Sequence, residues 1–342
     1  MLNHPRRAWY VAAWSQDLEQ DKPLAVAILG EPIVLWRAGD RAVAFEDRCV
    51  HRMAPLSLGR CEGSKLRCMY HGVLYDSEGQ VVEIPGQPQL PPQARVRRYS
   101  VMEKHSWIWV WMGESALADA ALIPPAVGFE DPEWILGRGY LDYAAEARLI
   151  NDNLLDFSHL TYVHANSFGA GPSFAEERPQ LTALPRGVRF ERWIVGTRGP
   201  MGRKADDLVD GWSTYDFLIP GVLLMWSGSF PSGTAKACDF RKPDYARAIA
   251  GVTFTSQAVT PTAAKTARYF FSWGPHRDHG DEALRDILMG IAGKAFGEDK
   301  TIIEAQQRVI DATPEPRFMP TVHDRGVTLF NQLAARMLRE EQ

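Results

Sequence analysis

The sequence predicts an α+β fold, in which an antiparallel β module is followed by a larger strand-rich domain that also contains helices. Short apolar runs bounded by turn residues fill the first hundred or so residues, from Trp9–Trp14 to Ser106–Trp111. Further runs of strand length come later, and two helical stretches follow them, at 281–310 and 327–340. Because strands and helices do not alternate, a doubly wound parallel sheet is not expected.

A segment rich in small residues and proline divides the chain. With 342 residues the chain is long enough for two hydrophobic cores. The segment Gly113–Pro125, GESALADAALIPP, is typical of a linker. We therefore expect one domain over residues 1–115 and a second over residues 116–342.

The first domain is expected to be a small antiparallel module. Its expected strands are Trp9–Trp14, Leu24–Leu29, Ile33–Arg37 and Ala42–Phe45. Val73–Tyr75 runs into the turn Asp76–Gly79, which predicts a hairpin. Tryptophan recurs at every second position from Trp107 to Trp111. This row could stack on a nucleic acid or a sugar, but we interpret it as one sheet face packed in a core or interface.

The second domain is expected to hold one longer sheet and three helices. A helix is expected over 149–164, and the helix at 281–310 is expected to be interrupted near 290–297, where glycines recur. The expected strands are 140–147, 187–195, 212–218, 222–226, 248–259 and 267–273.

Composition excludes several function classes. The chain has 38 basic and 42 acidic residues, so it carries no footprint for nucleic acid or an anionic membrane. No apolar run approaches the ~20 residues of a spanning helix, and neither a signal-peptide pattern nor a nucleotide-binding glycine motif is found. We expect a soluble, cytoplasmic protein in which Cys61 and Cys238 are free thiols.

Two Cys/His pairs form the first candidate site. They are Cys49-Val50-His51 and, after sixteen residues, Cys68-Met69-Tyr70-His71. Two thiolates and two imidazoles can bind one metal centre, and this donor set favours zinc or an iron–sulfur cluster. A zinc finger groups its cysteines before its histidines, whereas each arm here carries one of each. The interleaved order favours a [2Fe–2S] cluster with two cysteines on one iron and two histidines on the other. A zinc knuckle is the alternative.

The first predicted helix of the second domain carries the other candidate site. Asn153, Asp156 and His159 recur every third residue and would share one face of an ideal helix. His164 lies about 140° further round, at ~100° per residue, so the helix must bulge or end between the histidines if both bind one ion. Asp299 is the candidate third ligand. Two histidines and a carboxylate are typical of an oxygen-activating ferrous site. A structural role for these residues is the alternative.

Together, these motifs resemble the oxygenase component of a Rieske non-haem iron oxygenase, and the resemblance covers essentially the whole chain. The family's iron-binding pattern (Asp, two residues, His, four residues, His) is matched at Asp156, His159 and His164, and Asp299 is carried over as the third ligand. Within the family, the chain looks similar to the vanillate and dicamba O-demethylase branch. The stretches that carry this likeness are AWYVA at 8–12, DKP at 21–23, DRCVHR at 47–52 and YHG at 70–72.

The resemblance implies an architecture and a set of cofactors. It implies a catalytic domain with a helix-grip-like sheet, a mononuclear Fe(II), and a ring-shaped homotrimer in which one subunit's cluster lies beside the next subunit's iron. Asp156 would bridge His71 of the neighbour and His159 of its own chain, or else orient His159 within one subunit. Asn153 would lie near the iron. Electrons would come from NAD(P)H through a flavin-dependent reductase, a ferredoxin, or both.

The implied activity is that of a terminal monooxygenase. It would use O2 and reductase-supplied electrons to hydroxylate an O-methyl or N-alkyl carbon of an aromatic substrate, and the product would collapse with loss of an aldehyde. The alternatives are an aromatic ring-hydroxylating mono- or dioxygenase of the same family and a non-enzymatic iron–sulfur electron-transfer protein.

The substrate pocket is expected to be largely apolar. Where dicamba-type members place a His and a Trp, this chain has Gln257 and Gly290, which predicts a roomier pocket that is less suited to an anion. The candidate lining residues are Phe217, Leu224, Trp226, Phe230, Phe254 and Gln257.

Overall fold

The computed structural model describes residues 4–168, 171–198 and 208–341. The chain divides into two compact units. The first contains residues 1–124, 260–265 and 341–342, and the second contains residues 125–259 and 266–340. The division after Pro124 falls within the segment that the sequence marks as a linker.

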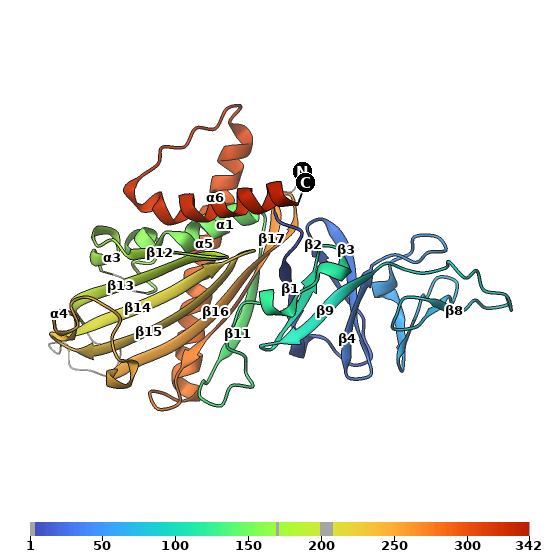
Figure 1. Cartoon of the computed structure of the whole chain (residues 1–342), viewed down its shortest axis with the longest axis horizontal. Coiled ribbons are helices and arrows are strands. Elements are labelled where there is room, and N and C mark those ends of the chain that lie inside the picture. Colours follow the sequence, from blue (N-terminus) through green and yellow to red (C-terminus); the bar gives the residue numbers. More distant parts are fainter. Residues whose placement is uncertain (1–3, 169–170, 199–207, 342) are drawn as a thin grey trace. The chain divides into compact units, whose positions relative to one another are not determined.

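The first unit consists of two antiparallel sheets (Figure 1), as the sequence predicts. The six-stranded sheet has the order β1-β10-β9-β4-β3-β2, and the four-stranded sheet has the order β5-β6-β7-β8. The strands of the larger sheet are β1 Trp9–Trp14, β2 Leu24–Ile28, β3 Glu31–Ala38, β4 Arg41–Glu46, β9 Arg98–Lys104 and β10 Trp107–Trp111. Those of the smaller sheet are β5 Arg60–Glu62, β6 Lys65–Arg67, β7 Leu74–Tyr75 and β8 Val81–Glu83. The predicted hairpin is β7 and β8.

The tryptophan row is part of a core, as expected. Trp107, Trp109 and Trp111 are all almost completely buried. The rings at the two ends of the row lie against β1, with Trp111 5.5 Å from Trp9 and Trp107 5.1 Å from Trp14 between ring centroids. Such a row does not form a stacking platform for a ligand, because its rings are used within the protein.

The second unit is built on one seven-stranded antiparallel sheet with the order β11-β17-β16-β15-β14-β13-β12. Its strands are β11 Gly137–Tyr143, β12 Gln180–Leu184, β13 Gly187–Arg198, β14 Leu208–Leu218, β15 Val222–Pro231, β16 Ala250–Ala263 and β17 Thr266–Pro275. The helices are α1 Ala147–Leu155, α2 Leu160–Val163, α3 Ser173–Glu176, α4 Thr234–Ala237, α5 Glu282–Ala312 and α6 Arg325–Glu340. No described helix has both the length and the apolar character needed to cross a bilayer.

Helices α5 and α6 cover one face of this sheet (Figure 1). On that face, Phe217 of β14 packs against Phe330 of α6, and Tyr269 of β17 packs against Phe296 of α5. Tyr269 also donates a hydrogen bond to Gln257 of β16. Because side chains alternate along a strand, these contacts fix which residues of each strand face the helices.

The helix expected over 149–164 is in fact broken, and the break is at Asp156. Helix α1 ends at Leu155, Asp156 is extended (φ −131°, ψ 98°), and a 3-10 turn over Phe157–His159 leads into α2. The Asp156 carboxylate accepts a hydrogen bond from the Ser158 N–H, so it caps the new turn. The prediction that Asn153, Asp156 and His159 share one helical face is therefore wrong. The expected end between the two histidines is confirmed, because α2 stops at Val163, and the break at Asp156 is an additional one that precedes both.

The interruption expected in the late helix is also wrong, because α5 runs unbroken for 31 residues. Its N-terminus is capped by Asp281, whose carboxylate accepts from the Leu284 N–H. Buried residues recur along one side of the helix: Leu288, Ala292, Ala295, Phe296, Asp299, Ile303 and Gln307. Burial of this stripe outweighs the cost of each helical glycine, which is about 1 kcal/mol relative to alanine.

Replacing Gly290 by alanine should stabilise the protein by about 0.5–1 kcal/mol, because the glycine loses more backbone entropy on folding. The position is exposed, and a Cβ there would meet no atom within 4 Å. Gly326→Ala in α6 is the control, since a Cβ at that position would lie 2.4 Å from the Phe190 ring and should destabilise. Denaturant unfolding would measure both changes. A lower unfolding free energy for Gly290→Ala would contradict the prediction.

Candidate metal centres

The two Cys/His arms fold into loops of the same design. In each loop the N–H of the residue four positions after the cysteine donates to the cysteine carbonyl, from Met53 to Cys49 and from Gly72 to Cys68. The donor residue has a positive φ in both loops, 60° at Met53 and 76° at Gly72. At Gly72 the glycine is also needed for space, because a Cβ would lie 2.7 Å from the Pro85 ring. The two loops therefore share the same backbone geometry, although their sequences differ.

These loops arrange the four donors in two layers. Cys49 and Cys68 are buried free thiols that neighbour each other. His51 and His71 are exposed, with ring centroids 4.6 Å apart. Two sulfurs inside and two imidazoles at the surface form the donor set of a [2Fe–2S] cluster with mixed ligands, so the residues fit that group.

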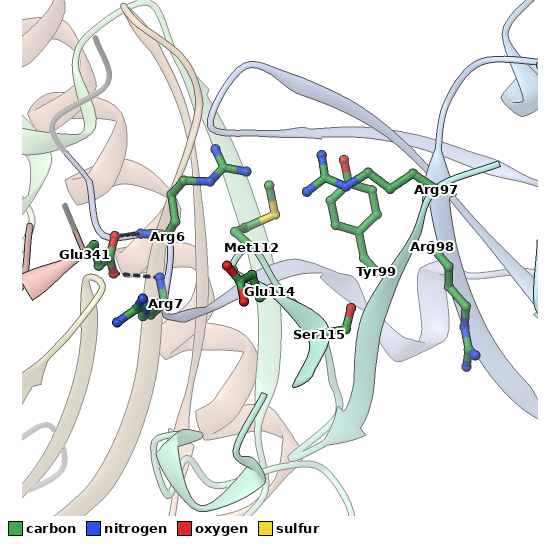
Figure 2. Close-up of a pocket in the computed structure, with 10 residues that line it drawn as sticks. Arg6, Arg7, Arg97, Arg98, Tyr99, Met112, Glu114, Ser115 and Glu341 are labelled. Atoms are coloured by element: carbon green, nitrogen blue, oxygen red, sulfur yellow. Dashed lines mark hydrogen bonds between the residues drawn. The ribbon is translucent and has the colours of Figure 1, made fainter. Parts of the chain in front are cut away.

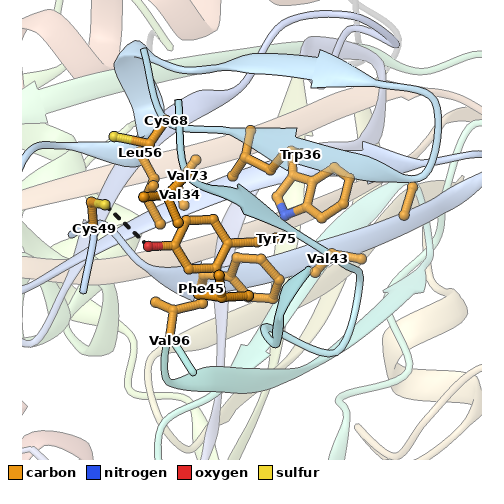
Figure 3. Close-up of a cluster of buried hydrophobic side chains, with 13 residues drawn as sticks. Val34, Trp36, Val43, Phe45, Cys49, Leu56, Cys68, Val73, Tyr75 and Val96 are labelled. Carbon is orange, nitrogen blue, oxygen red and sulfur yellow. Dashed lines mark hydrogen bonds between the residues drawn. The ribbon is translucent and has the colours of Figure 1, made fainter. Parts of the chain in front are cut away.

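Tyr75 of β7 is a polar side chain in contact with this set that the sequence interpretation did not single out. It is completely buried in the hydrophobic cluster around the thiols (Figure 3). Its hydroxyl oxygen accepts from the Val50 N–H at 3.0 Å and lies 3.1 Å from the Cys49 sulfur. Because the Val50 N–H uses the oxygen as an acceptor, the hydroxyl proton is free to point at the sulfur.

The second centre brings His159, His164 and Asp299 together. Their ligand atoms all lie within 4.8 Å of one another. Both imidazoles turn Nε2 toward the same carboxylate oxygen of Asp299, at 3.5 Å from His159 and 3.2 Å from His164. The histidines come from the 3-10 turn and the end of α2, and the aspartate comes from the buried stripe of α5.

The far nitrogen of each imidazole is engaged elsewhere. The His159 Nδ1–H donates to the Asp156 carbonyl at 2.6 Å, and the His164 Nδ1–H donates to the Glu298 carboxylate at 2.9 Å. Ser167 donates to the same Glu298 oxygen at 2.6 Å. With Nδ1 protonated, the neutral ring offers the Nε2 lone pair to the space beside Asp299. This is the tautomer that a metal ion requires, so these residues fit a mononuclear iron.

The electrostatics of this centre favour a cation. Burial lowers the pKa of His159. Burial also acts to lower the pKa of His164, but hydrogen bonds to Asp299 and Glu298 outweigh it, and the pKa is raised. Hydrogen bonds from Ser167 and His164 lower the pKa of Glu298, which keeps that carboxylate ionised. The centre therefore keeps Glu298 charged while burial favours neutral His159.

The two residues expected to assist the iron lie in different places. Asn153 on α1 donates from its side-chain amide to the Asp299 oxygen at 3.1 Å. Asp156 touches His159 through its backbone carbonyl, and its carboxylate accepts from Ser158. The contact between Asn153 and Asp299 links α1 to α5 directly at the candidate centre.

The expected lining residues divide between the two faces of the sheet. Phe217 and Gln257 lie on the face that α5 and α6 cover, as their contacts with Phe330 and Tyr269 indicate. Cross-strand pairing puts the others on the opposite face: Leu224, Trp226, Phe230 and Phe254. There Trp226 stacks on Tyr245 and Phe230 packs on Trp193. Apolar strand residues alternate between two buried faces here, so hydrophobicity did not distinguish them.

Other aromatic rings lie beside the candidate iron ligands, and the sequence interpretation missed them. The Phe168 ring is 5.1 Å from the His164 ring and 5.9 Å from the Trp273 ring, between centroids. Phe296 lies 6.3 Å from Phe168, three residues before Asp299. The three-residue spacing of Phe296 and Asp299 on a helix was the only available signal.

Comparison with known proteins agrees with this arrangement. Residues 8–99 match the Rieske [2Fe–2S] domain, and residues 143–340 match the vanillate O-demethylase oxygenase C-terminal domain. The chain belongs to the Rieske non-haem iron oxygenases. As a member of this family it has a [2Fe–2S] cluster and a mononuclear iron as cofactors, and the alternatives of a zinc knuckle and a simple electron carrier are set aside.

Three members of this oxygenase family give the scale of the similarity. The putative toluene-4-sulfonate monooxygenase system iron–sulfur subunit TsaM2 of Comamonas testosteroni is 37% identical, over 98% of this chain and 97% of its own length. A vanillate O-demethylase oxygenase subunit from a Pseudomonas species is 35% identical over 99% of this chain and 96% of its own length. The crystal structure of dicamba monooxygenase with non-haem iron and dicamba has a TM-score of 0.79 at 26% identity, covering 98% of each chain.

Proposed function

We propose that this oxygenase carries out oxidative demethylation or N-dealkylation of an aromatic substrate, with Cys49, His51, Cys68 and His71 as cluster ligands and His159, His164 and Asp299 as iron ligands. The observation that carries the proposal is the convergence of two Nε2 atoms and one carboxylate within 4.8 Å. Both histidines are already in the ligating tautomer, and a set of two histidines and one carboxylate leaves positions open for O2.

The cofactors supply the oxidising power and the chain supplies position. When bound, the cluster passes on single electrons and the iron activates O2. Glu298 and the Asp156 carbonyl hold the imidazoles, and Asn153 holds the Asp299 carboxylate through a 3.1 Å hydrogen bond. Phe168, Trp273 and Phe296 would shield the open side of the centre and pack on an aromatic ring.

Electrons need a donor and a route. We assign the donor to a separate flavin-dependent reductase, with or without a ferredoxin, because relatives are named as subunits of oxygenase systems. The exposed edge of the cluster bears His51 and His71 beside apolar side chains that are about half exposed or more: Val50, Met53, Met69 and Tyr70. Such an edge suits docking on a second copy in a homotrimer, where Asp156 would accept a hydrogen bond from His71 of the neighbouring subunit.

The reaction balances with one O2, two electrons and two protons. One oxygen atom enters a C–H bond of the methyl or alkyl carbon, and the other leaves as water. The resulting hemiacetal or hemiaminal breaks its C–O or C–N bond, releasing an aldehyde and a phenol or amine. A second candidate is hydroxylation of an aryl methyl group, favoured by the relative named for toluene-4-sulfonate, and its product is a stable alcohol.

A product assay should distinguish these reactions. The full-length protein, reconstituted with iron and sulfide and supplied with NADH and a reductase, would be given methoxybenzoates, N-alkyl anilides and toluene-4-sulfonate under labelled O2. We expect one aldehyde per O2 consumed from an ether or amide, with one labelled oxygen retained in the aldehyde before exchange. Absence of aldehyde from the whole panel would exclude dealkylation, and two labelled atoms in one product would indicate a dioxygenase.

Replacing Glu298 by glutamine should weaken iron binding by about 10–100-fold, because the charged acceptor that holds His164 is lost. Chelator competition for Fe(II) would measure the affinity without any turnover. The visible spectrum of the cluster should not change. Glu282→Gln, at an exposed position on the same helix, is the matched control. Equal iron affinity in the Glu298 and Glu282 variants would refute the role given to Glu298.

Replacing Tyr75 by phenylalanine should lower the reduction potential of the cluster. The ring packing is retained, but the sulfur loses a hydrogen bond, which destabilises the more negative reduced state. A net difference of about 1 kcal/mol corresponds to about 40 mV for one electron. A redox titration followed by electron spin resonance would measure it. Tyr70→Phe removes only the hydroxyl of an exposed tyrosine in the Cys68–His71 arm and keeps the ring that packs against His71, so it should leave the potential unchanged. The same potential in both variants would contradict the prediction.

A further inference from the structure

A pocket of about 150 Å³ in the second unit is lined by basic side chains. We call it the Arg192 pocket. Arg178, Arg192 and Arg325 contribute three guanidinium groups to its lining, together with His323, against the single carboxylate of Asp156. That carboxylate already accepts a hydrogen bond from the Ser158 N–H at 2.8 Å. The pocket therefore has an excess of positive charge and of hydrogen-bond donors.

Arg192 is the residue that makes this pocket unusual. It lies on β13 and is only 9% exposed. Its guanidinium donates to the Phe174 carbonyl at 3.3 Å and lies over the Phe174 ring at 5.1 Å. Within the described part of the chain, no carboxylate is within ion-pair distance of it, although the charges of Asp156 and Glu177 act on it from further away, and burial lowers its pKa. Burying a charge without an ion pair is costly, so the folded protein gains if an anion supplies one.

Two other places with arginines among the described residues do not have this deficit. The larger pocket in the first unit, about 480 Å³, is also lined by arginines (Figure 2). There Arg6 and Arg97 both pair with Glu31, and Arg98 pairs with Glu78. On β13 itself, the exposed Arg189 forms a two-pronged ion pair with Asp216. Arg192 is buried and lacks such a partner, whereas these exposed arginines have one.

The pocket is separate from the candidate iron centre. Asp156 in its wall meets His159 at Nδ1, the ring nitrogen remote from the one that faces Asp299. A ligand in the Arg192 pocket would thus lie behind the imidazole, so the pocket is distinct from the place where substrate would meet iron.

We propose that the Arg192 pocket is a carboxylate-binding site. A planar carboxylate matches the fork of a guanidinium with two parallel hydrogen bonds, and the pocket has room for a small one. The carboxylate comes either from a small free acid or from an Asp or Glu side chain of a second copy of this chain. Both sources present the same chemistry to Arg192. Binding of a free acid depends on the concentration of the acid, whereas binding to a second copy depends on the concentration of the protein.

The test compares full-length, iron-loaded protein with Arg192→Met, which keeps the aliphatic length but removes the charge. Arg189→Met on the same strand is the matched control. Melting temperature is followed in sodium acetate against sodium chloride at equal ionic strength, and again at increasing protein concentration, with sedimentation at each step. Neither measurement depends on turnover.

If the ligand is a free acid, acetate should raise the melting temperature of the wild type and of Arg189→Met saturably, by about 2–4 °C, and should not do so for Arg192→Met. If a second copy supplies it, the melting temperature should rise with protein concentration, acetate should compete, and Arg192→Met should weaken assembly at least tenfold.

Two results would overturn the proposal. One is a wild type whose melting temperature responds neither to acetate nor to protein concentration. The other is an Arg192→Met variant that is destabilised yet keeps the same response as Arg189→Met, which would make Arg192 a structural residue only. Should Arg192→Met fail to fold, Arg192→Lys keeps the charge but loses the planar fork. Its response to acetate or to protein concentration should then be at least tenfold weaker, and an unweakened response would reject the proposal.

Discussion

The candidate iron centre depends on one constraint: each imidazole that faces Asp299 is fixed by a hydrogen bond on its other nitrogen. A free imidazole can present either nitrogen and can rotate, so a ligand set of two histidines is poorly defined without such partners. Here the Asp156 carbonyl and the Glu298 carboxylate remove both freedoms. The two acceptors come from different elements, the break after α1 and the middle of α5, so the centre forms only when those elements have packed.

The cluster arms solve a similar problem with the backbone instead of side chains. Each loop closes on its own cysteine carbonyl, and each uses a residue with positive φ to do so. Gly72 adopts that conformation without strain, whereas Met53 is a residue type that seldom does. Surrounding apolar side chains bury both sulfurs and leave the imidazoles at the surface. The low-dielectric side of the site is therefore the sulfur side, and the side open to partners is the imidazole side.

The sequence contained enough information to predict the chemistry of both centres, and less about their shape. Metal-ligand residue types are few and their spacing is specific, so residue type and spacing were sufficient to predict a metal centre at the Cys/His arms. The pattern from Asp156 to His164 was interpreted through its resemblance to the family's iron-binding pattern. The additional break at Asp156 was missed because ideal helix geometry was applied to a segment in which an aspartate caps a new turn. The glycines of α5 suggested an interruption that packing overrides. Pocket residues were hardest to predict, because Trp226 and Gln257 belong to strands whose two faces are both apolar.

Glu298 and Asp299 are consecutive residues on α5, and this adjacency links two parts of the candidate iron centre. Successive side chains on a helix diverge by about 100°, so one residue reaches the shared space between the histidines while its neighbour reaches the back of His164. One candidate ligand and the residue that supports another candidate ligand therefore lie on the same helix. Any shift or rotation of helix α5 would displace Glu298 and Asp299 together. The geometry of the candidate centre would therefore depend on the position of a whole 31-residue helix and not on a single rotamer.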